Sequence, residues 1–352
     1  MEMNNKETRR VVIGITAHVD AGKTTLAEAM LYRTGQLRKL GRVDHGSAAM
    51  DSHLLERERG ITIFLSQAEL PLGDMEVTLL DTPGHVDFSA EMERTLSVLD
   101  YAILVISGVD GVQAHTRTLW RLLELYRVPT FLFVTKMDFG RRDRDCLMES
   151  LRHELGEGCV DFTPAARDRR MEQLATCRED ALEAYLDTGM VPEELVRQLV
   201  RQRLVFPCWF GSGLKLEGID EFLEGLARYV EPPAYPAAFS ARVFKISHDA
   251  QGKRLTHLKV TGGTLRVRDA ISYGGRQEKA AQLRIYTGGR FRPVDQVPAG
   301  GICAVQGLTA TWGGQGLGER EEAVRPVLEP VMRYRICLLY TSPSPRDYAA
   351  SR

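Results

Sequence analysis

Residues 17–24 of the chain are Ala-His-Val-Asp-Ala-Gly-Lys-Thr, a sequence pattern typical of a phosphate-binding loop. An apolar run at residues 11–15 precedes the loop, and a helical pattern follows it. A P-loop requires this order of strand, loop and helix, because the loop N–H groups and the helix N-terminus then face the phosphates. Lys23 would reach the β- and γ-phosphates, and the Thr24 hydroxyl would ligate Mg²⁺. The general motif opens with Gly, whereas this chain has Ala17.

Four further motifs follow the loop in order along the chain. They are Arg-Gly-Ile-Thr-Ile at 59–63, Asp-Thr-Pro-Gly-His at 81–85, Thr-Lys-Met-Asp at 135–138 and Gly-Ser-Gly-Leu-Lys at 211–215. All but the first come directly after a strand-like apolar run, and ligands of open α/β sheets bind at that edge. We therefore predict an α/β P-loop GTPase domain with a mostly parallel sheet and helices on both faces.

Three of the motifs would surround the phosphates and a metal ion. Asp81 ends a predicted strand and would hold Mg²⁺ through water, and Thr62 would close on the same ion when GTP is bound. The Gly84 N–H is free to contact the γ-phosphate, so loss of that phosphate would release both segments. The predicted phosphate-binding residues are Ala17, His18, Val19, Asp20, Ala21, Gly22, Lys23, Thr24, Thr25 and Gly84, and the predicted metal ligands are Thr24, Thr62 and Asp81.

The other two motifs would recognise the base. The Asp138 carboxylate can accept hydrogen bonds from guanine N1–H and N2–H₂, which adenine does not offer as a pair, so GTP is favoured over ATP. Lys136 would lie along the base and brace the loop. The predicted guanine-binding residues are Thr135, Lys136, Asp138, Ser212, Gly213 and Leu214.

His85 follows the γ-phosphate contact directly in sequence. It could orient the water that attacks the phosphate, a reaction that asks little covalent chemistry of the protein. We predict that His85 is the catalytic residue, that GTP is hydrolysed to GDP and phosphate, and that Mg²⁺ is the cofactor.

Together these motifs resemble those of the translational GTPases, specifically the elongation factor G group. Residues 17–25, 54–63, 96–100 and 110–116 are most similar to the tetracycline-resistance ribosomal protection proteins. The resemblance covers residues 10 to about 336. It implies a ribosome-stimulated GTPase whose partners are GTP, GDP and the ribosome, contacted through ribosomal RNA and the small subunit.

The resemblance also implies roles for individual residues. His85 is then the catalytic histidine, which the sarcin–ricin loop of ribosomal RNA positions for hydrolysis. Val19 and Ile61 match the family's apolar gate beside that histidine. Ala17 matches the family's first loop residue, so the missing Gly is no objection.

Two positions depart from the family pattern. The family usually has Asn where this chain has Thr135, and Ser-Ala is commoner where it has Ser212-Gly213. The Asn amide contacts the base and ties its loop to the P-loop, so we expect Thr135 to weaken nucleotide affinity while Asp138 keeps guanine specificity. The backbone N–H of residue 213 remains, and we expect little effect there.

Changes of pattern along the chain predict its organisation. Residues 10–230 form the GTP-binding domain, with a helical insertion at about 141–202 that is rich in Arg, Glu and Leu. Residues 231–238 carry paired prolines, which cannot continue a helix, and form a linker. Short alternating runs at 239–325 predict a small all-β barrel that resembles domain II of translation factors. Residues 326–336 resemble the start of a truncated third domain.

Residues 337–352 break this resemblance abruptly. The run Cys-Leu-Leu-Tyr-Thr-Ser-Pro-Ser-Pro-Arg-Asp at 337–347 resembles translated sequencing adapter, and we expect the tail to be non-native. The alternative is a native Pro/Ser-rich disordered tail.

Composition excludes several other classes of protein. The 352 residues are 43% hydrophobic and 26% charged, and the net charge of −1 gives no global electrostatic case for nucleic acid. The six cysteines form no Cys-x-x-Cys pair, and no apolar stretch approaches the roughly 20 residues of a membrane span. The polar first ten residues contain no secretory signal. We expect a cytoplasmic monomer without membrane contact.

The sequence therefore predicts a GTP-hydrolysing translation factor of the ribosomal-protection type, present as an N-terminal fragment. Two alternatives stay open: an elongation factor G-like translocase, and a GTP-dependent binding or assembly module with little hydrolysis. A metabolic P-loop enzyme that prefers ATP is a more remote alternative.

Overall fold

The computed structural model describes residues 9–37, 66–82, 89–140, 143–249, 251–287, 290–320 and 322–324. Its first part is built on a seven-stranded sheet in the order β2-β3-β1-β4-β5-β7-β6, in which β2 and β3 are antiparallel and all other neighbours are parallel. The strands are β1 (Arg9–Ala17), β2 (Ser66–Leu72), β3 (Met75–Asp81), β4 (Tyr101–Ser107), β5 (Thr130–Thr135), β6 (Cys159–Asp161) and β7 (Phe206–Phe210).

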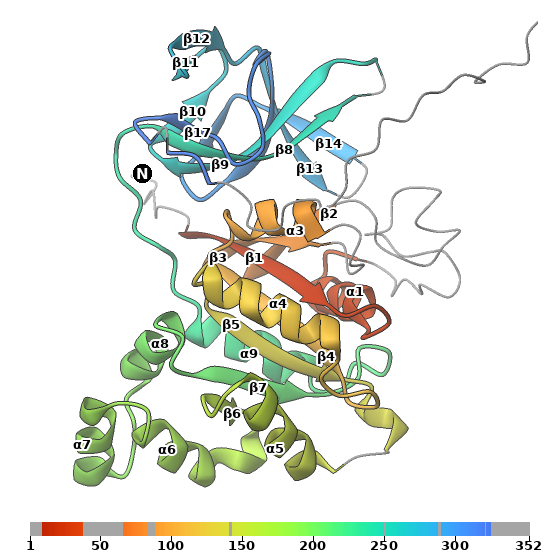
Figure 1. The fold of residues 1–352 in the computed structure, drawn as a ribbon, viewed down its shortest axis with the longest axis vertical. Coiled ribbons are helices and arrows are strands. Elements are labelled where there is room, and N and C mark those ends of the chain that lie inside the picture. Colours follow the sequence, from red (N-terminus) through yellow and green to blue (C-terminus); the bar gives the residue numbers. More distant parts are fainter. Residues whose placement is uncertain are drawn as a thin grey trace, which may run out of the picture.

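Helices cover both faces of this sheet (Figure 1). Successive strand residues point to opposite faces, so a strand buried on both sides is apolar throughout. Ile103 and Phe131 accordingly lie in one core with α1 (Lys23–Arg33) and α9 (Ile219–Tyr229). Leu104 and Leu132 lie in a second core with helices α4 (Ala114–Leu125) and α5 (Arg144–Leu155). The predicted α/β class is confirmed.

The insertion between β5 and β7 is mostly helical. After α5 it contains α6 (Arg167–Ala175), α7 (Glu179–Thr188) and α8 (Glu193–Arg201). It also contains β6, which pairs in parallel with β7 and extends the sheet at its edge. The expectation of helices alone missed this strand, because three residues are too few to show a period of two.

The second part of the chain is antiparallel. A six-stranded sheet in the order β14-β13-β16-β9-β8-β17 is accompanied by the ladders β10–β15 and β11–β12. The strands are β8 (Ser240–His248), β9 (Arg254–Gly262), β10 (Thr264–Arg266), β11 (Ala270–Tyr273), β12 (Arg276–Lys279), β13 (Gln282–Thr287), β14 (Arg290–Val294), β15 (Gln296–Pro298), β16 (Ile302–Gln306) and β17 (Gly316–Gly318).

One apolar core joins the sheet to both ladders of this second part. Val243 and Val305 of the sheet lie in the same buried cluster as Leu265 of β10 and Ile271 of β11. The prediction of a P-loop domain followed by an all-β domain is therefore confirmed. The predicted start of a third domain, 326–336, and the adapter-like tail, 337–352, lie outside the described residues.

A partly buried carboxylate connects the two parts of the molecule. Asp100, just before β4, accepts hydrogen bonds from the Val12 N–H of β1 at 2.8 Å and from the Lys259 Nζ of β9 at 2.6 Å. Lys259 also donates to the carbonyl oxygen of Val98 at 3.0 Å. Burial lowers the pKa of the Lys259 ammonium, and the adjacent Asp100 carboxylate opposes that shift. Phe244 of β8 packs beside them against Val12 and Val98.

We predict that Lys259→Met destabilises the protein by about 3–5 kcal/mol, because it leaves the Asp100 carboxylate, whose side chain is only 11% exposed, without its cation. Calorimetric unfolding would measure the loss. The double variant Lys259→Met/Asp100→Asn should lose much less than the sum of the two single variants, since neither charge is then stranded. Additive losses would show that the two side chains do not stabilise each other.

Candidate functional site

The loop between β1 and α1 has the geometry of a phosphate cradle. Gly22 caps α1 with φ of 90°, a left-handed conformation that favours glycine, and its carbonyl oxygen accepts the Leu26 N–H at 2.9 Å. The Ala21 N–H donates to the His18 carbonyl oxygen at 3.2 Å, which closes the preceding turn. Lys23 and Thr24 are therefore the first two residues of the helix. The sequence pattern placed both residues in the loop and predicted the helix only after it, so the helix begins earlier than expected.

The end of β3 lies level with this loop. Thr82 donates its hydroxyl to the Ile15 carbonyl oxygen at 2.9 Å and its N–H to the same oxygen at 3.2 Å. This holds Asp81 opposite Ile15 in the parallel register of β1 and β3. Asp81 has no exposed surface and forms an ion pair with Lys23, whose side chain is 8% exposed. The structure thus brings together the predicted phosphate-binding lysine and one of the predicted metal ligands.

The two predicted base-recognition loops lie side by side. The Met137 N–H donates to the Gly211 carbonyl oxygen at 3.1 Å, and the Gly211 N–H donates to the Val134 carbonyl oxygen at 2.9 Å. Lys136 has φ of 60°, so the chain turns sharply where β5 ends. A short 3₁₀ helix, η3 (Met137–Phe139), follows and carries Asp138.

Side chains of these loops are only partly available to solvent. The Asp138 side chain is 9% exposed, and its carboxylate lies 3.9 Å from Lys215 Nζ. Ser212 is buried, and its N–H and carbonyl group exchange hydrogen bonds of 3.0 Å with Glu217. Leu214, by contrast, is 45% exposed. The motif at 211–215 contained Lys215, but no role was predicted for it, and only the fold shows that it reaches Asp138.

The base loop also touches the phosphate helix directly. A Cβ atom added at Gly213 would lie 3.2 Å from the carbonyl carbon and oxygen of Thr25 and 3.3 Å from the Leu26 nitrogen. Such contacts are tight, so Ala at this position would move the loop or α1 by a few tenths of an ångström. The expectation that Gly213 has little effect concerned its N–H group only and stays a prediction.

Thr135 connects the base loops to the P-loop. Its hydroxyl lies 2.5 Å from the Ala21 carbonyl oxygen and 3.2 Å from that of Ile106, so its single hydrogen favours Ala21. In the family pattern, the amide of the Asn that Thr135 replaces was expected to make such a tie. The structure shows that the threonine hydroxyl makes one. The weaker nucleotide affinity expected for Thr135 would then come only from the lost contact between the Asn amide and the base.

Of the remaining P-loop residues, His18 lies near α4. His18 is half-buried, and its ring centroid lies 6.0 Å from that of His115. Val19 is also half-buried, and Asp20 is exposed with φ of 61°. The predicted residues Ile61, Thr62, Gly84 and His85 lie outside the described residues, and their roles stay predictions.

This arrangement defines a P-loop nucleotide-binding protein. Two family models match the chain: the elongation factor Tu GTP binding domain over residues 8–232 and elongation factor G domain 2 over residues 238–317. The chain therefore belongs to the translational GTPases.

Individual relatives give the same result. The oxytetracycline resistance protein of Streptomyces rimosus is 38% identical over 365 residues, which cover 91% of this chain and 55% of the relative. The tetracycline resistance protein TetM from transposon Tn916 of Enterococcus faecalis is 34% identical and covers 84% and 49%. A crystal structure from Thermus thermophilus has a TM-score of 0.80 at 26% identity, over 90% of this chain and 55% of that one. The chain thus spans about half the length of these relatives.

We predict that Thr135→Val weakens GDP binding roughly fivefold to tenfold. This is the change in dissociation constant that corresponds to the loss of one buried hydrogen bond. Thr135→Asn should instead tighten GDP binding by adding an amide at the base. Equilibrium titration with a fluorescent GDP analogue would measure both.

Thr130→Val is the matched control, since Thr130 lies at the other end of β5 and bonds to Val128. Unchanged GDP binding in Thr135→Val would refute the role of the hydroxyl. Failure of Thr135→Asn to tighten binding would refute the account of the family difference.

Proposed function

We propose that this chain carries the GTP-binding and GTP-hydrolysing part of a ribosomal protection factor that acts as a monomer on cytoplasmic ribosomes. The convergence of the Lys23–Asp81 pair with the Thr135–Asp138 loop at one edge of the sheet carries the GTPase part of the proposal. The relatives named for tetracycline resistance support the ribosomal part. In the described ranges, no helix is long and apolar enough to cross a membrane.

The phosphate end of the site suits Mg²⁺. Asp81 supplies a fully buried carboxylate, and Thr24 supplies a hydroxyl from the first turn of α1. Such hard oxygen donors, completed by nucleotide phosphates and water, are the usual environment of this ion. The described residues hold no group of three or more His, Cys, Asp or Glu side chains arranged for a metal, and a phosphate-bound magnesium needs none. Thr62 would complete the site.

The protein groups act mainly by positioning and by charge. The N–H groups of the P-loop and the Lys23 ammonium would hold the phosphate oxygens, with Asp81 as the second partner of Lys23. Magnesium, when bound, would neutralise the charge that develops between the β- and γ-phosphates. Gly84 would contact the γ-phosphate, and His85 would orient the attacking water behind the Val19 and Ile61 gate.

Guanine would bind against the loops at 135–138 and 211–214. The Asp138 carboxylate is held near Lys215 and is shielded from solvent, which strengthens its hydrogen bonds to the two guanine donors. Lys136 would lie along the ring, and the N–H of residue 213 would face guanine O6.

We predict that Asp138→Asn weakens GTP binding at least roughly 100-fold, because two charge-assisted hydrogen bonds are lost. An amide can donate to the extra carbonyl group of xanthine, so the variant should prefer xanthosine triphosphate. Competition titration with both nucleotides would measure this. Asp143→Asn is the control, since Asp143 is exposed at the start of α5. Equal affinity for ATP and GTP in the wild type would refute guanine recognition.

We predict that His85→Ala lowers ribosome-stimulated phosphate release roughly 100-fold or more while GTP affinity is kept, as expected for loss of a water-orienting group. His153→Ala is the control, because His153 is exposed on α5.

Release of ribosome-bound radiolabelled tetracycline, measured with the same proteins, would test the protection role. Restored translocation without tetracycline release would favour a translocase instead, and absence of hydrolysis would favour a GTP-dependent binding module.

A further inference from the structure

The insertion begins and ends at the two base loops. The chain leaves the first loop at Phe139, enters α5 at Arg144, and returns through β7, whose last residue is Phe210. Phe210 directly precedes Gly211, which bonds to both Val134 and Met137. A displacement of Phe210 would therefore move both loops that are proposed to hold guanine.

Arg144 makes contacts in both directions from this point. Its guanidinium carbon lies 5.2 Å from the centroid of the Phe210 ring. Its Nη1 donates to the Thr163 hydroxyl oxygen at 3.1 Å. That hydroxyl in turn donates to Asp161 Oδ1 at 2.7 Å, and the Thr163 N–H donates to the same oxygen at 2.8 Å. Asp161 is the last residue of β6, so the series of contacts ends in the sheet.

The space behind the loops explains why such a contact has an effect. A pocket of about 370 Å³ that opens to solvent is lined by Met137 and Gly211 from the loops and by Arg144, Thr163 and Pro164 from the insertion. On this side the loops face the open pocket rather than packed side chains. The stacked guanidinium supports Phe210 along this wall.

The position of Arg144 in its helix is locally unfavourable. A cation in the first turn opposes the positive end of the helix dipole. Arg144 is the first residue of α5, between the acidic Asp143 and Asp145. A residue that opposes local helix preference is compensated by its other contacts, here with Phe210 and Thr163.

We infer that Arg144 is a positioning residue that holds the two base loops in the arrangement that binds guanine. This inference rests on the proposed GTP binding and names what the insertion contributes to it. A preformed loop pays less ordering entropy on binding, so the contact raises the affinity for GDP and GTP alike. The phosphate contacts and the hydrolysis step do not depend on it.

Nucleotide dissociation from purified protein tests the inference. Arg144→Ala should speed dissociation of fluorescent GDP and GTP analogues roughly fivefold, the effect expected for losing one partly buried cation–aromatic contact. The dissociation rate from Arg144→Lys should lie between those from the wild type and from Arg144→Ala, because a lysine still donates to Thr163 but stacks poorly on Phe210. Thr163→Val keeps Arg144 and should also speed dissociation.

The ratio of GDP to inosine diphosphate affinity distinguishes positioning from general stability. Inosine lacks the N2 amino group and makes one hydrogen bond fewer to Asp138, so displaced loops should lower this ratio. Lower stability alone would reduce the fraction of folded protein and leave the ratio unchanged. The turnover number for GTP should stay at the wild-type value.

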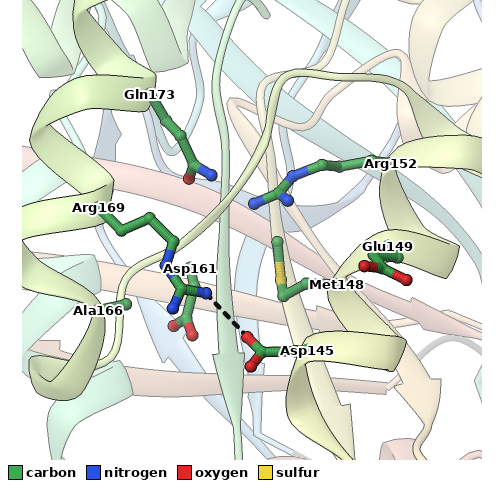
Figure 2. Close-up of a pocket in the computed structure, with 8 residues that line it drawn as sticks. All are labelled: Asp145, Met148, Glu149, Arg152, Asp161, Ala166, Arg169 and Gln173. Carbon is green, nitrogen blue, oxygen red and sulfur yellow. Dashed lines mark hydrogen bonds and ion pairs between the residues drawn. The ribbon is translucent and has the colours of Figure 1, made fainter.

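Arg169→Ala is the matched control. Figure 2 shows Arg169 paired with Asp145 across a separate pocket of the insertion, and their side chains, 2.9 Å apart, are both exposed. The inference would be overturned if Arg144→Ala kept the wild-type dissociation rates and the wild-type ratio of GDP to inosine diphosphate affinity. It would also be overturned if Arg169→Ala changed these quantities by as much as Arg144→Ala does. A wild-type protein that binds no guanine nucleotide would instead overturn the proposed function on which it rests.

Discussion

The hydrogen bonds of the Asp100 carboxylate hold the two domains in their relative position. This carboxylate joins the backbone of β1, which leads into the P-loop, to Lys259 of the second domain. The hydroxyl of Tyr235, from the segment between the domains, lies 3.5 Å from the same carboxylate, and burial together with that carboxylate raises the pKa of the hydroxyl. Burying a charge is costly unless it is paired and hydrogen-bonded, and all these partners satisfy Asp100 at once. The second domain is therefore fixed to the strand that presents the phosphate loop.

The site itself follows from where parallel strands end. β1, β3, β5 and β7 deliver the P-loop, Asp81 and the two base loops to the same edge, because all four run in one direction. Cross-links then set the distances between these pieces: Thr82 to Ile15, Thr135 to Ala21, and Met137 to Gly211. Each cross-link uses a backbone carbonyl as acceptor, so the spacing of the site depends on the backbone more than on the charged groups.

Much of this could be predicted from sequence because P-loop motifs are local. Strand, loop and helix begin within 25 residues of the N-terminus, and Gly22 meets a backbone requirement that few other residues satisfy. The fold class followed from the apolar runs before every motif except the one at 59–63. The Thr135 bond to Ala21 could not be predicted, since it joins residues 114 positions apart and a hydroxyl has no sequence signature for its acceptor. Lys215 beside Asp138, the short strand β6 and Lys259 beside Asp100 depend in the same way on tertiary contact.

The place of the insertion has a physical consequence for the site. Most long insertions extend from a surface loop and need not disturb the sheet. This one separates β5 and β7, the two strands whose ends carry the proposed base loops, and it adds β6 to the same sheet next to β7. Its motion relative to the core would therefore reach the base loops unless something fixed its first helix. The contacts of α5 with β7 and with Thr163 fix that helix. One set of interactions therefore joins the first helix of the insertion to the strand that ends at the proposed base loop.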